Sequence, residues 1–126
     1  MSGTSVRKRG FITGRLLGVG FAVRGAVRLL TTEHSIMVQA VIAVIVTIAG
    51  FLFGISRAEW MFQIFAIALV MTAEGLNTAI EKTCDFFHPQ YHDKIGFIKD
   101  ISAGAVFLAA SAAVLIGLII YVPKFI

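Results

Sequence analysis

Four polar residues whose side chains could accept a proton or hold a cation share one face of a predicted helix. They are Glu74, Asn77, Glu81 and Asp85, with Thr78 beside them. Their spacing of i, i+3, i+7 and i+11 confines the four to a narrow stripe, because an α-helix turns about 100° per residue. Two of the four are glutamates, which could serve as a general base for an alcohol or as ligands of a metal ion.

The stripe starts inside an apolar segment, so its depth in a membrane can be calculated. With Trp60 at the outer interface, Glu74 lies about 21 Å deeper and Glu81 about 31 Å deeper, at about 1.5 Å per residue. Glu81 is therefore expected at the cytoplasmic boundary and Glu74 about 10 Å inside it, because the hydrocarbon core is about 30 Å thick. A charge at the centre of a membrane helix costs about 2.5–3.5 kcal/mol, and less near the boundary, so such a carboxylate usually has a function.

The alternative is a non-catalytic helical membrane protein, such as a small channel or an assembly subunit. In that protein Glu74 and Asn77 would only hydrogen-bond a neighbouring helix in a polar seam. A single polar residue would favour this interpretation. Four polar residues on one stripe, two of them glutamates, favour a catalytic site.

Other polar groups are predicted to meet the stripe at the same boundary. Glu33 precedes the first apolar segment, Lys99-Asp100 precedes the third, and Gln90-Tyr91-His92 lies between the second and the third. Two glutamates that are distant in sequence but level in depth suit Mg²⁺, which takes oxygen ligands together with substrate phosphates. A lysine suits a phosphate group.

The composition sets the environment in which these residues act. The chain has 126 residues, of which 58% are hydrophobic and 14% are charged, and its mean hydropathy is +0.90. A soluble domain of this length has too much surface to bury so many apolar side chains. Soluble kinases, Rossmann enzymes and secreted disulfide modules are thereby excluded, the last also because Cys84 is the only cysteine.

The apolar residues divide into one interfacial segment and three membrane spans. Residues 10–31 mix arginines with large apolar residues and are expected to form a helix in the membrane interface. The spans are expected at 34–54, 59–86 and 99–122, and the first contains an 18-residue run without a charge. The second is expected to extend into the cytoplasm. The predicted fold is therefore all-α, in one domain over residues 1–126.

The basic residues predict the orientation. Nine of the 11 lysines and arginines lie before the first span or in residues 82–100, where the second span reaches the cytoplasm and joins the third, and only Arg57 and Lys124 lie on the other side. By the positive-inside rule the N-terminus is cytoplasmic and the C-terminus is outside. The net charge of +4 is spread thinly between apolar blocks, so anionic lipid headgroups are favoured as its partner and nucleic acid is not expected.

The residues that carry the chemistry also resemble those of a known family, the prokaryotic diacylglycerol kinases, which include the undecaprenol kinases of Gram-positive bacteria. The octad E-G-L-N-T-A-I-E at residues 74–81 is its most specific element. The resemblance extends over most of the chain, including Glu33, Asp85, Tyr91-His92, Lys99-Asp100 and Ala103-Gly104-Ala105. Trp60-Met61 and residues 117–124 look more like the undecaprenol kinase branch.

The resemblance implies a homotrimeric kinase of the bacterial cytoplasmic (inner) membrane, with active sites at the cytoplasmic surface between subunits. Such an enzyme transfers the γ-phosphate of MgATP to the hydroxyl of a membrane lipid, either diacylglycerol or undecaprenol. Glu74 would be the catalytic base and Asn77 would position the reacting groups, with Asp85 and Thr78 in support. Magnesium would be held by Glu33 and Glu81. The nucleotide would be bound by Gln90, Tyr91, His92, Lys99, Asp100, Phe21 and Arg15.

Overall fold

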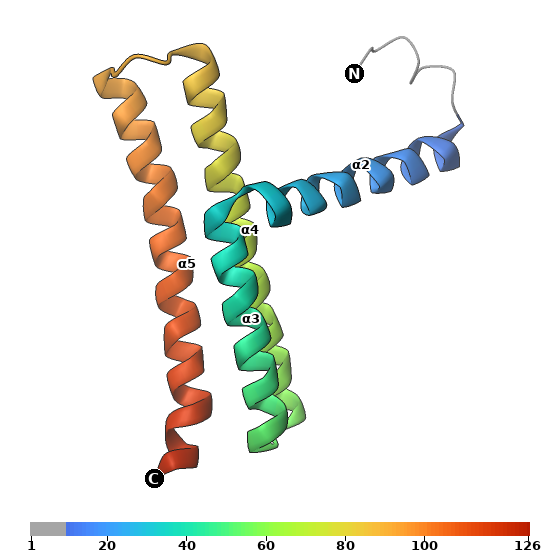
Figure 1. Cartoon of the computed structure of the whole chain (residues 1–126), viewed down its shortest axis with the longest axis vertical. Coiled ribbons are helices and arrows are strands. Elements are labelled where there is room, and N and C mark those ends of the chain that lie inside the picture. Colours follow the sequence, from blue (N-terminus) through green and yellow to red (C-terminus); the bar gives the residue numbers. More distant parts are fainter. Residues whose placement is uncertain (1–9) are drawn as a thin grey trace. The chain divides into compact units, whose positions relative to one another are not determined.

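The computed structural model describes residues 10–126, and these residues form four α-helices and no β-strand (Figure 1). The helices are α2 (Phe11–Thr32), α3 (His34–Phe53), α4 (Arg57–Phe87) and α5 (Asp93–Phe125). Two compact units contain them: residues up to Glu33 form the first, and residues from His34 form the second. Arg7, Lys8 and Arg9, which contribute to the predicted orientation, lie outside the described residues.

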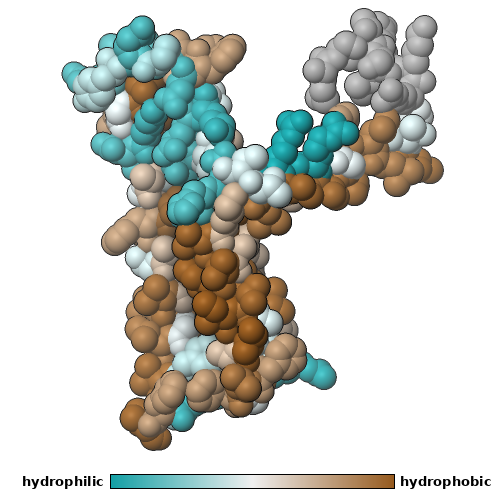
Figure 2. Space-filling view, viewed as in Figure 1, coloured by the Kyte–Doolittle hydropathy of each residue, from teal (hydrophilic) through white to brown (hydrophobic). Residues whose placement is uncertain are grey.

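The second unit contains three helices that are long and apolar enough to cross a membrane. These helices, α3, α4 and α5, have 20, 31 and 33 residues. Large apolar side chains cover their outer surface, including Phe62, Phe65, Phe107 and Leu108. Figure 2 shows hydrophilic atoms gathered at the end of this unit that bears the α4–α5 loop, with a mainly hydrophobic surface below. The predicted all-α membrane fold is thus confirmed.

A tight turn joins α3 to α4. Gly54 has φ of +60°, a conformation that glycine adopts without steric cost. Ser56 then caps α4: its Oγ accepts a hydrogen bond from the Glu59 N–H at 3.2 Å, and Glu59 Oε1 accepts one from the Ser56 N–H at 2.9 Å. This reciprocal capping box satisfies backbone donors that a helix start would otherwise leave unpaired. We call this end of the unit the turn end.

The central helix of the second unit is α4, which packs against both α3 and α5. Its buried residues recur along one side and include Gln63, Ala66, Val70, Thr78 and Cys84. On α5 the buried residues are Ser102, Ala109 and Ile120. Most of these side chains are small, which lets membrane helices approach closely. Ala109 is one of four small residues spaced four apart on α5, namely Ala105, Ala109, Ala113 and Gly117, and it is buried here.

The opposite end of the unit, the loop end, consists of residues 88–92 and the helix ends that flank them. Here α5 begins at Asp93, before the span expected from residue 99, because His92 caps the helix. The His92 Nδ1 accepts a hydrogen bond from the Lys94 N–H at 3.1 Å. At its other end α5 continues through Pro123 to Phe125, past the expected limit at residue 122. The extra turns lengthen the helix at both ends of the apolar stretch.

The first unit contains α2, an apolar helix with three arginines. Arg24 and Arg28 are one turn apart and lie on the same side, whereas Arg15 precedes Arg24 by nine residues and lies on the opposite side. The Arg15 guanidinium lies 5.0 Å from the centre of the Phe11 ring, and that of Arg24 lies 5.7 Å from the Phe21 ring. The arginines therefore do not all share one face of α2.

Candidate active site

The predicted polar stripe lies on one uninterrupted helix. Because α4 runs from Arg57 to Phe87 without a break, the spacing of the stripe places its members on one face. Glu74 and Asn77 are half-buried, whereas Glu81 and Asp85 are exposed. The stripe therefore passes from a partly enclosed region in the apolar part of the unit to an open region at the loop end. A lipid-borne group and a water-borne group could reach its two ends separately.

Asn77 is hydrogen-bonded to one of the two glutamates of the stripe. Its Nδ2 donates a hydrogen bond to Glu81 Oε1 at 3.3 Å. Its Oδ1 is buried and has no hydrogen-bond partner among the described residues. A buried acceptor without a partner costs about 1–3 kcal/mol, and such groups concentrate at functional sites. An incoming donor or a cation would satisfy this oxygen.

Thr78, predicted to support the stripe, is buried on α4. Ser102 of α5 is buried as well. Sequence reasoning missed Ser102. The only sequence signal for it was its position three residues after Lys99, which places it on the same side of α5.

An ion pair ties the loop end of α4 to α5. The Lys99 Nζ and the Asp85 Oδ1 are 2.6 Å apart. The two side chains are 36% and 60% exposed, so water screens the pair and it contributes little to folding stability. The ion pair instead positions the Lys99 ammonium beside α4, the helix that carries the stripe.

A pocket of about 300 Å³ lies at the loop end. It brings together four of the residues predicted to bind nucleotide, namely Gln90, Tyr91, Lys99 and Asp100. Its other lining residues, which sequence reasoning did not assign, are His88, Pro89, Ile95 and Gly96. Lys99 therefore both lines the pocket and pairs with the helix that carries the stripe.

Two contacts shape this pocket. The Tyr91 ring lies over Gly96, where an added Cβ would stand 3.3 Å from Tyr91 Cε2. The His88 Nδ1 lies 2.7 Å from the Gln90 carbonyl oxygen, a contact that folds the loop back on itself. His92, also predicted to bind nucleotide, does not line the pocket. Its ring stands 5.5 Å from that of His88, edge to face, while its Nδ1 caps α5.

The remaining predicted site residues belong to the first unit. Glu33 is the C-cap residue that follows α2, and its N–H donates to the Leu29 carbonyl at 3.2 Å. Phe21 and Arg15 are exposed on the same helix. Among residues 10–126 no three His, Cys, Asp or Glu side chains cluster closely enough to hold a metal ion.

Comparisons with known proteins converge on one family. Residues 20–121 match the family described as prokaryotic diacylglycerol kinase. Undecaprenol kinase of Bacillus subtilis (strain 168) is 39% identical over 103 residues, which cover 82% of this chain and 84% of that protein. Diacylglycerol kinase of Synechocystis sp. is 32% identical over 86% of this chain and 62% of its own length. Diacylglycerol kinase of Escherichia coli (strain K12) is 26% identical over 76% of this chain and 79% of its own length.

Proposed function

Because the chain belongs to the prokaryotic diacylglycerol kinase family and is therefore a lipid kinase, we propose that it transfers the γ-phosphate of MgATP to the hydroxyl of undecaprenol. The observation that carries the proposal is the stripe on α4. Glu74 stands half-buried in an apolar span, and the same face continues to Glu81 and Asp85 at the loop end, where Lys99 lines a pocket. This arrangement suits a lipid hydroxyl at the half-buried end of the stripe and a water-borne nucleotide at the exposed end.

Glu74 is proposed as the general base. The lipid hydroxyl oxygen attacks the γ-phosphorus, its proton passes to the Glu74 carboxylate, and the bond between the γ-phosphorus and the bridging oxygen of ADP breaks. The products are the lipid phosphate and ADP. Asn77 lies one turn further along the same face, and its unpaired Oδ1 could accept a hydrogen bond from a reacting group. Phosphoryl transfer depends mainly on positioning and charge stabilisation, which few residues can supply.

Glu33 and Glu81 are proposed as the magnesium ligands. Mg²⁺ prefers oxygen donors and is usually held by one or two carboxylates together with substrate phosphates. The exposed carboxylate of Glu81, beside the unpaired oxygen of Asn77, fits that donor set. When bound, the ion would neutralise negative charge on the phosphates.

The pocket at the loop end is proposed to bind ATP. Lys99 would contact a phosphate group, and Tyr91 offers an aromatic face, supported by Gly96, on which a base could stack. Gln90, Asp100 and the adjoining His92 complete the proposed nucleotide-binding set in this unit. Phe21 and Arg15 are proposed from the resemblance alone.

Undecaprenol is favoured over diacylglycerol by the degree of similarity. The relative named undecaprenol kinase is 39% identical, compared with 32% and 26% for two relatives named diacylglycerol kinase. Diacylglycerol remains the second candidate because those relatives carry its name. We further propose a homotrimer in the bacterial cytoplasmic (inner) membrane, with a cytoplasmic N-terminus and active sites between subunits, from the resemblance and the charge distribution.

One assay tests the proposal. The protein is purified in mixed micelles, and transfer of labelled phosphate from MgATP is followed separately to undecaprenol and to diacylglycerol. We expect transfer to both and a higher kcat/KM for undecaprenol. Glu74→Gln should abolish most of the transfer. Absence of transfer to any lipid alcohol, or equal rates for the wild type and Glu74→Gln, would overturn the proposal.

A further inference from the structure

An apolar groove of about 360 Å³ lies between the three spanning helices, distinct from the pocket at the loop end. Its walls are mainly aliphatic and come from all three helices, for example Ile42 of α3, Ile67 of α4 and Ile116 of α5. Ile42 and Val114, from α3 and α5, line the groove yet are 46% and 60% exposed, so the groove opens between those two helices. A hydrocarbon chain could therefore enter from the side.

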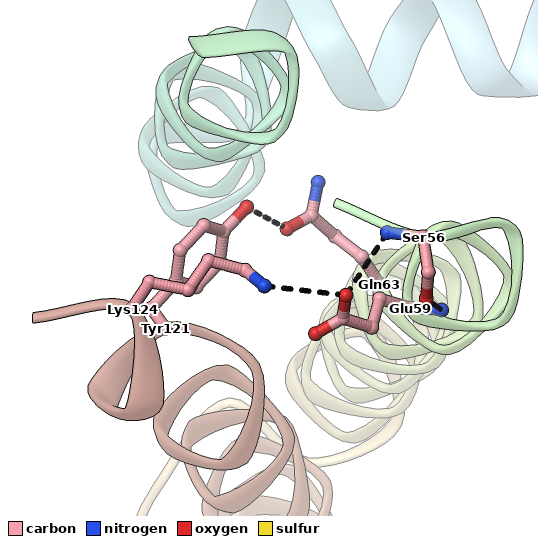
Figure 3. Close-up of polar contacts among 5 residues, drawn as sticks. All are labelled: Ser56, Glu59, Gln63, Tyr121 and Lys124. Carbon is pink, nitrogen blue, oxygen red and sulfur yellow. Dashed lines mark hydrogen bonds and ion pairs between the residues drawn. The ribbon is translucent and has the colours of Figure 1, made fainter. Parts of the chain in front are cut away.

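A polar network closes the groove toward the turn end. Figure 3 shows Tyr121 and Gln63 pointing toward each other, and their hydroxyl and amide oxygens are hydrogen-bonded. The Gln63 Nε2 donates to the Val46 carbonyl at 3.0 Å, and the Tyr121 hydroxyl lies 3.1 Å from the same oxygen. These groups satisfy one another, and Gln63 is only 5% exposed. At the closed end, the polar groups of Gln63 and Tyr121 are therefore already hydrogen-bonded within the protein, and they do not require a polar ligand.

The α4 wall of the groove continues into the catalytic stripe. Glu74 follows Gln63 by eleven residues and Val70 by four, which at about 100° per residue puts it within about 20° and 40° of their directions. Along the axis, Glu74 lies about 6 Å beyond Val70. Met71 lines the groove at this end, with Gln39 of α3 and Ala110 of α5. The end of the groove nearer the loop thus leads to the proposed base along one helix face.

We infer that this groove binds the hydrocarbon tail of the lipid substrate and so orients its hydroxyl toward Glu74. The inference rests on the proposed function, since it assigns a place to the chain of the lipid that Glu74 activates. The occupant follows from three observations: aliphatic walls, a closed turn end, and an opposite end on the face of Glu74. The tail enters between α3 and α5 and extends toward the turn end.

The test compares two neighbouring positions on α3. Ala43 lines the groove, whereas Val44 does not and is 59% exposed. Ala43→Phe puts a ring inside the groove, and Val44→Phe puts the same ring outside. Both variants and the wild type are assayed with undecaprenol and with prenol, a single isoprene unit that is too short to extend along the groove. We expect Ala43→Phe to lower the ratio of kcat/KM for undecaprenol to that for prenol by about tenfold. Val44→Phe should keep the wild-type ratio.

A second measurement uses the wild type and does not depend on the folding of a variant. Undecaprenol with a diazirine in an early isoprene unit is activated by light, and the labelled peptides are mapped. Labelling of groove residues such as Ala113 and Gly117 supports the inference, whereas labelling confined to outward residues such as Leu115 overturns it.

The outcomes separate the inference from the function on which it rests. If the wild type phosphorylates neither alcohol, the proposed function fails. If the wild type is active and Ala43→Phe keeps the wild-type ratio, the groove assignment fails alone. If a helix from a second copy fills the groove, Ala43→Phe changes the particle size in detergent without changing that ratio, and this result also overturns the inference.

Discussion

Asn77 and Glu81, one turn apart on α4, are joined by a hydrogen bond of 3.3 Å from Nδ2 to Oε1. The bond fixes the direction of the amide and leaves its Oδ1 buried and unpaired. Glu74 begins the same stripe, three residues before Asn77. The amide thus contacts the proposed metal ligand and shares a helix face with the proposed base, and the separate roles of the two glutamates can be tested by matched substitutions.

The two glutamates should give different kinetic defects. Glu74→Gln removes the proton acceptor but keeps the shape of the side chain, so kcat should fall by about 10²–10⁴-fold with little change in the KM for ATP. Glu81→Gln should chiefly raise the concentrations of Mg²⁺ and ATP that give half-maximal rate. Steady-state kinetics with varied MgATP measure both effects. Wild-type kinetics in both variants would contradict the assigned roles.

Lys99 should contribute to nucleotide affinity more than to stability. Lys99→Met removes the ammonium from the pocket and should raise the KM for ATP by about tenfold, because a charge-assisted contact to a phosphate is lost. The melting temperature should change little, since the pair with Asp85 is part-exposed. Lys94→Met is the matched control, because Lys94 is exposed and does not line the pocket. An equal rise in KM in both variants would argue against a specific contact.

The network at the turn end should contribute to stability. Tyr121→Phe removes the donor to the Gln63 Oε1 and should lower the free energy of unfolding by about 1 kcal/mol. Ser111→Ala is the control, since its hydroxyl bonds only the Phe107 carbonyl of its own helix and is exposed. Unfolding of both variants in mixed detergent micelles measures the difference. A larger loss in Ser111→Ala would contradict the prediction.

Close packing at Gly50 should make that position intolerant of a side chain. An added Cβ would lie 2.6 Å from Trp60 Cη2 and 2.8 Å from Cζ2. Gly50→Ala should therefore destabilise the protein by about 1–3 kcal/mol, as overpacking does. Because Trp60 is the only tryptophan, its emission reports the displacement directly.

Gly25→Ala provides the control for Gly50→Ala. Nothing lies within 4 Å of an added Cβ at Gly25, and alanine favours a helix over glycine by about 1 kcal/mol. Gly25→Ala should therefore be neutral or stabilising and should leave the Trp60 emission unchanged. Equal destabilisation by both substitutions would mean that the contact with Trp60 is not the cause.

The proposed orientation can be measured with single cysteines in a Cys84→Ala background. An impermeant maleimide applied to intact cells should label Lys124→Cys, because the C-terminus is predicted to lie outside. Lys94→Cys should react only after the membrane is permeabilised. The unmodified protein should react weakly, since Cys84 is buried. The reverse pattern would invert the topology.

Much of the fold could be predicted because its determinants are local in sequence. The uncharged run after Ile36 predicted α3, and the helical spacing from Glu74 to Asp85 predicted that α4 continues past its apolar part. The start of α5 could not be placed, because it depends on whether the His92 ring turns back to accept the Lys94 N–H.

The pocket at the loop end and the groove between the spanning helices could not be predicted from the sequence. Gln63 and Tyr121 are 58 residues apart, and each by itself reads as an isolated polar residue in an apolar run. Their pairing follows only from the way α4 and α5 pack together. The packing of the Tyr91 ring against Gly96 likewise depends on the path of a short loop. Residue types predicted the stripe, whereas three-dimensional packing formed the cavities at its two ends.

The unbroken length of α4 has a consequence for the membrane itself. Its 31 residues span about 46 Å, whereas the hydrocarbon core is about 30 Å thick. Glu74 and Glu81 stand at fixed positions along this helix, so under the proposed roles the helix determines the depth at which a lipid hydroxyl can reach Glu74. We therefore expect the rate of phosphate transfer to depend on the thickness of the bilayer. A thicker or thinner membrane would move the headgroups relative to Glu74 although no residue of the protein has changed.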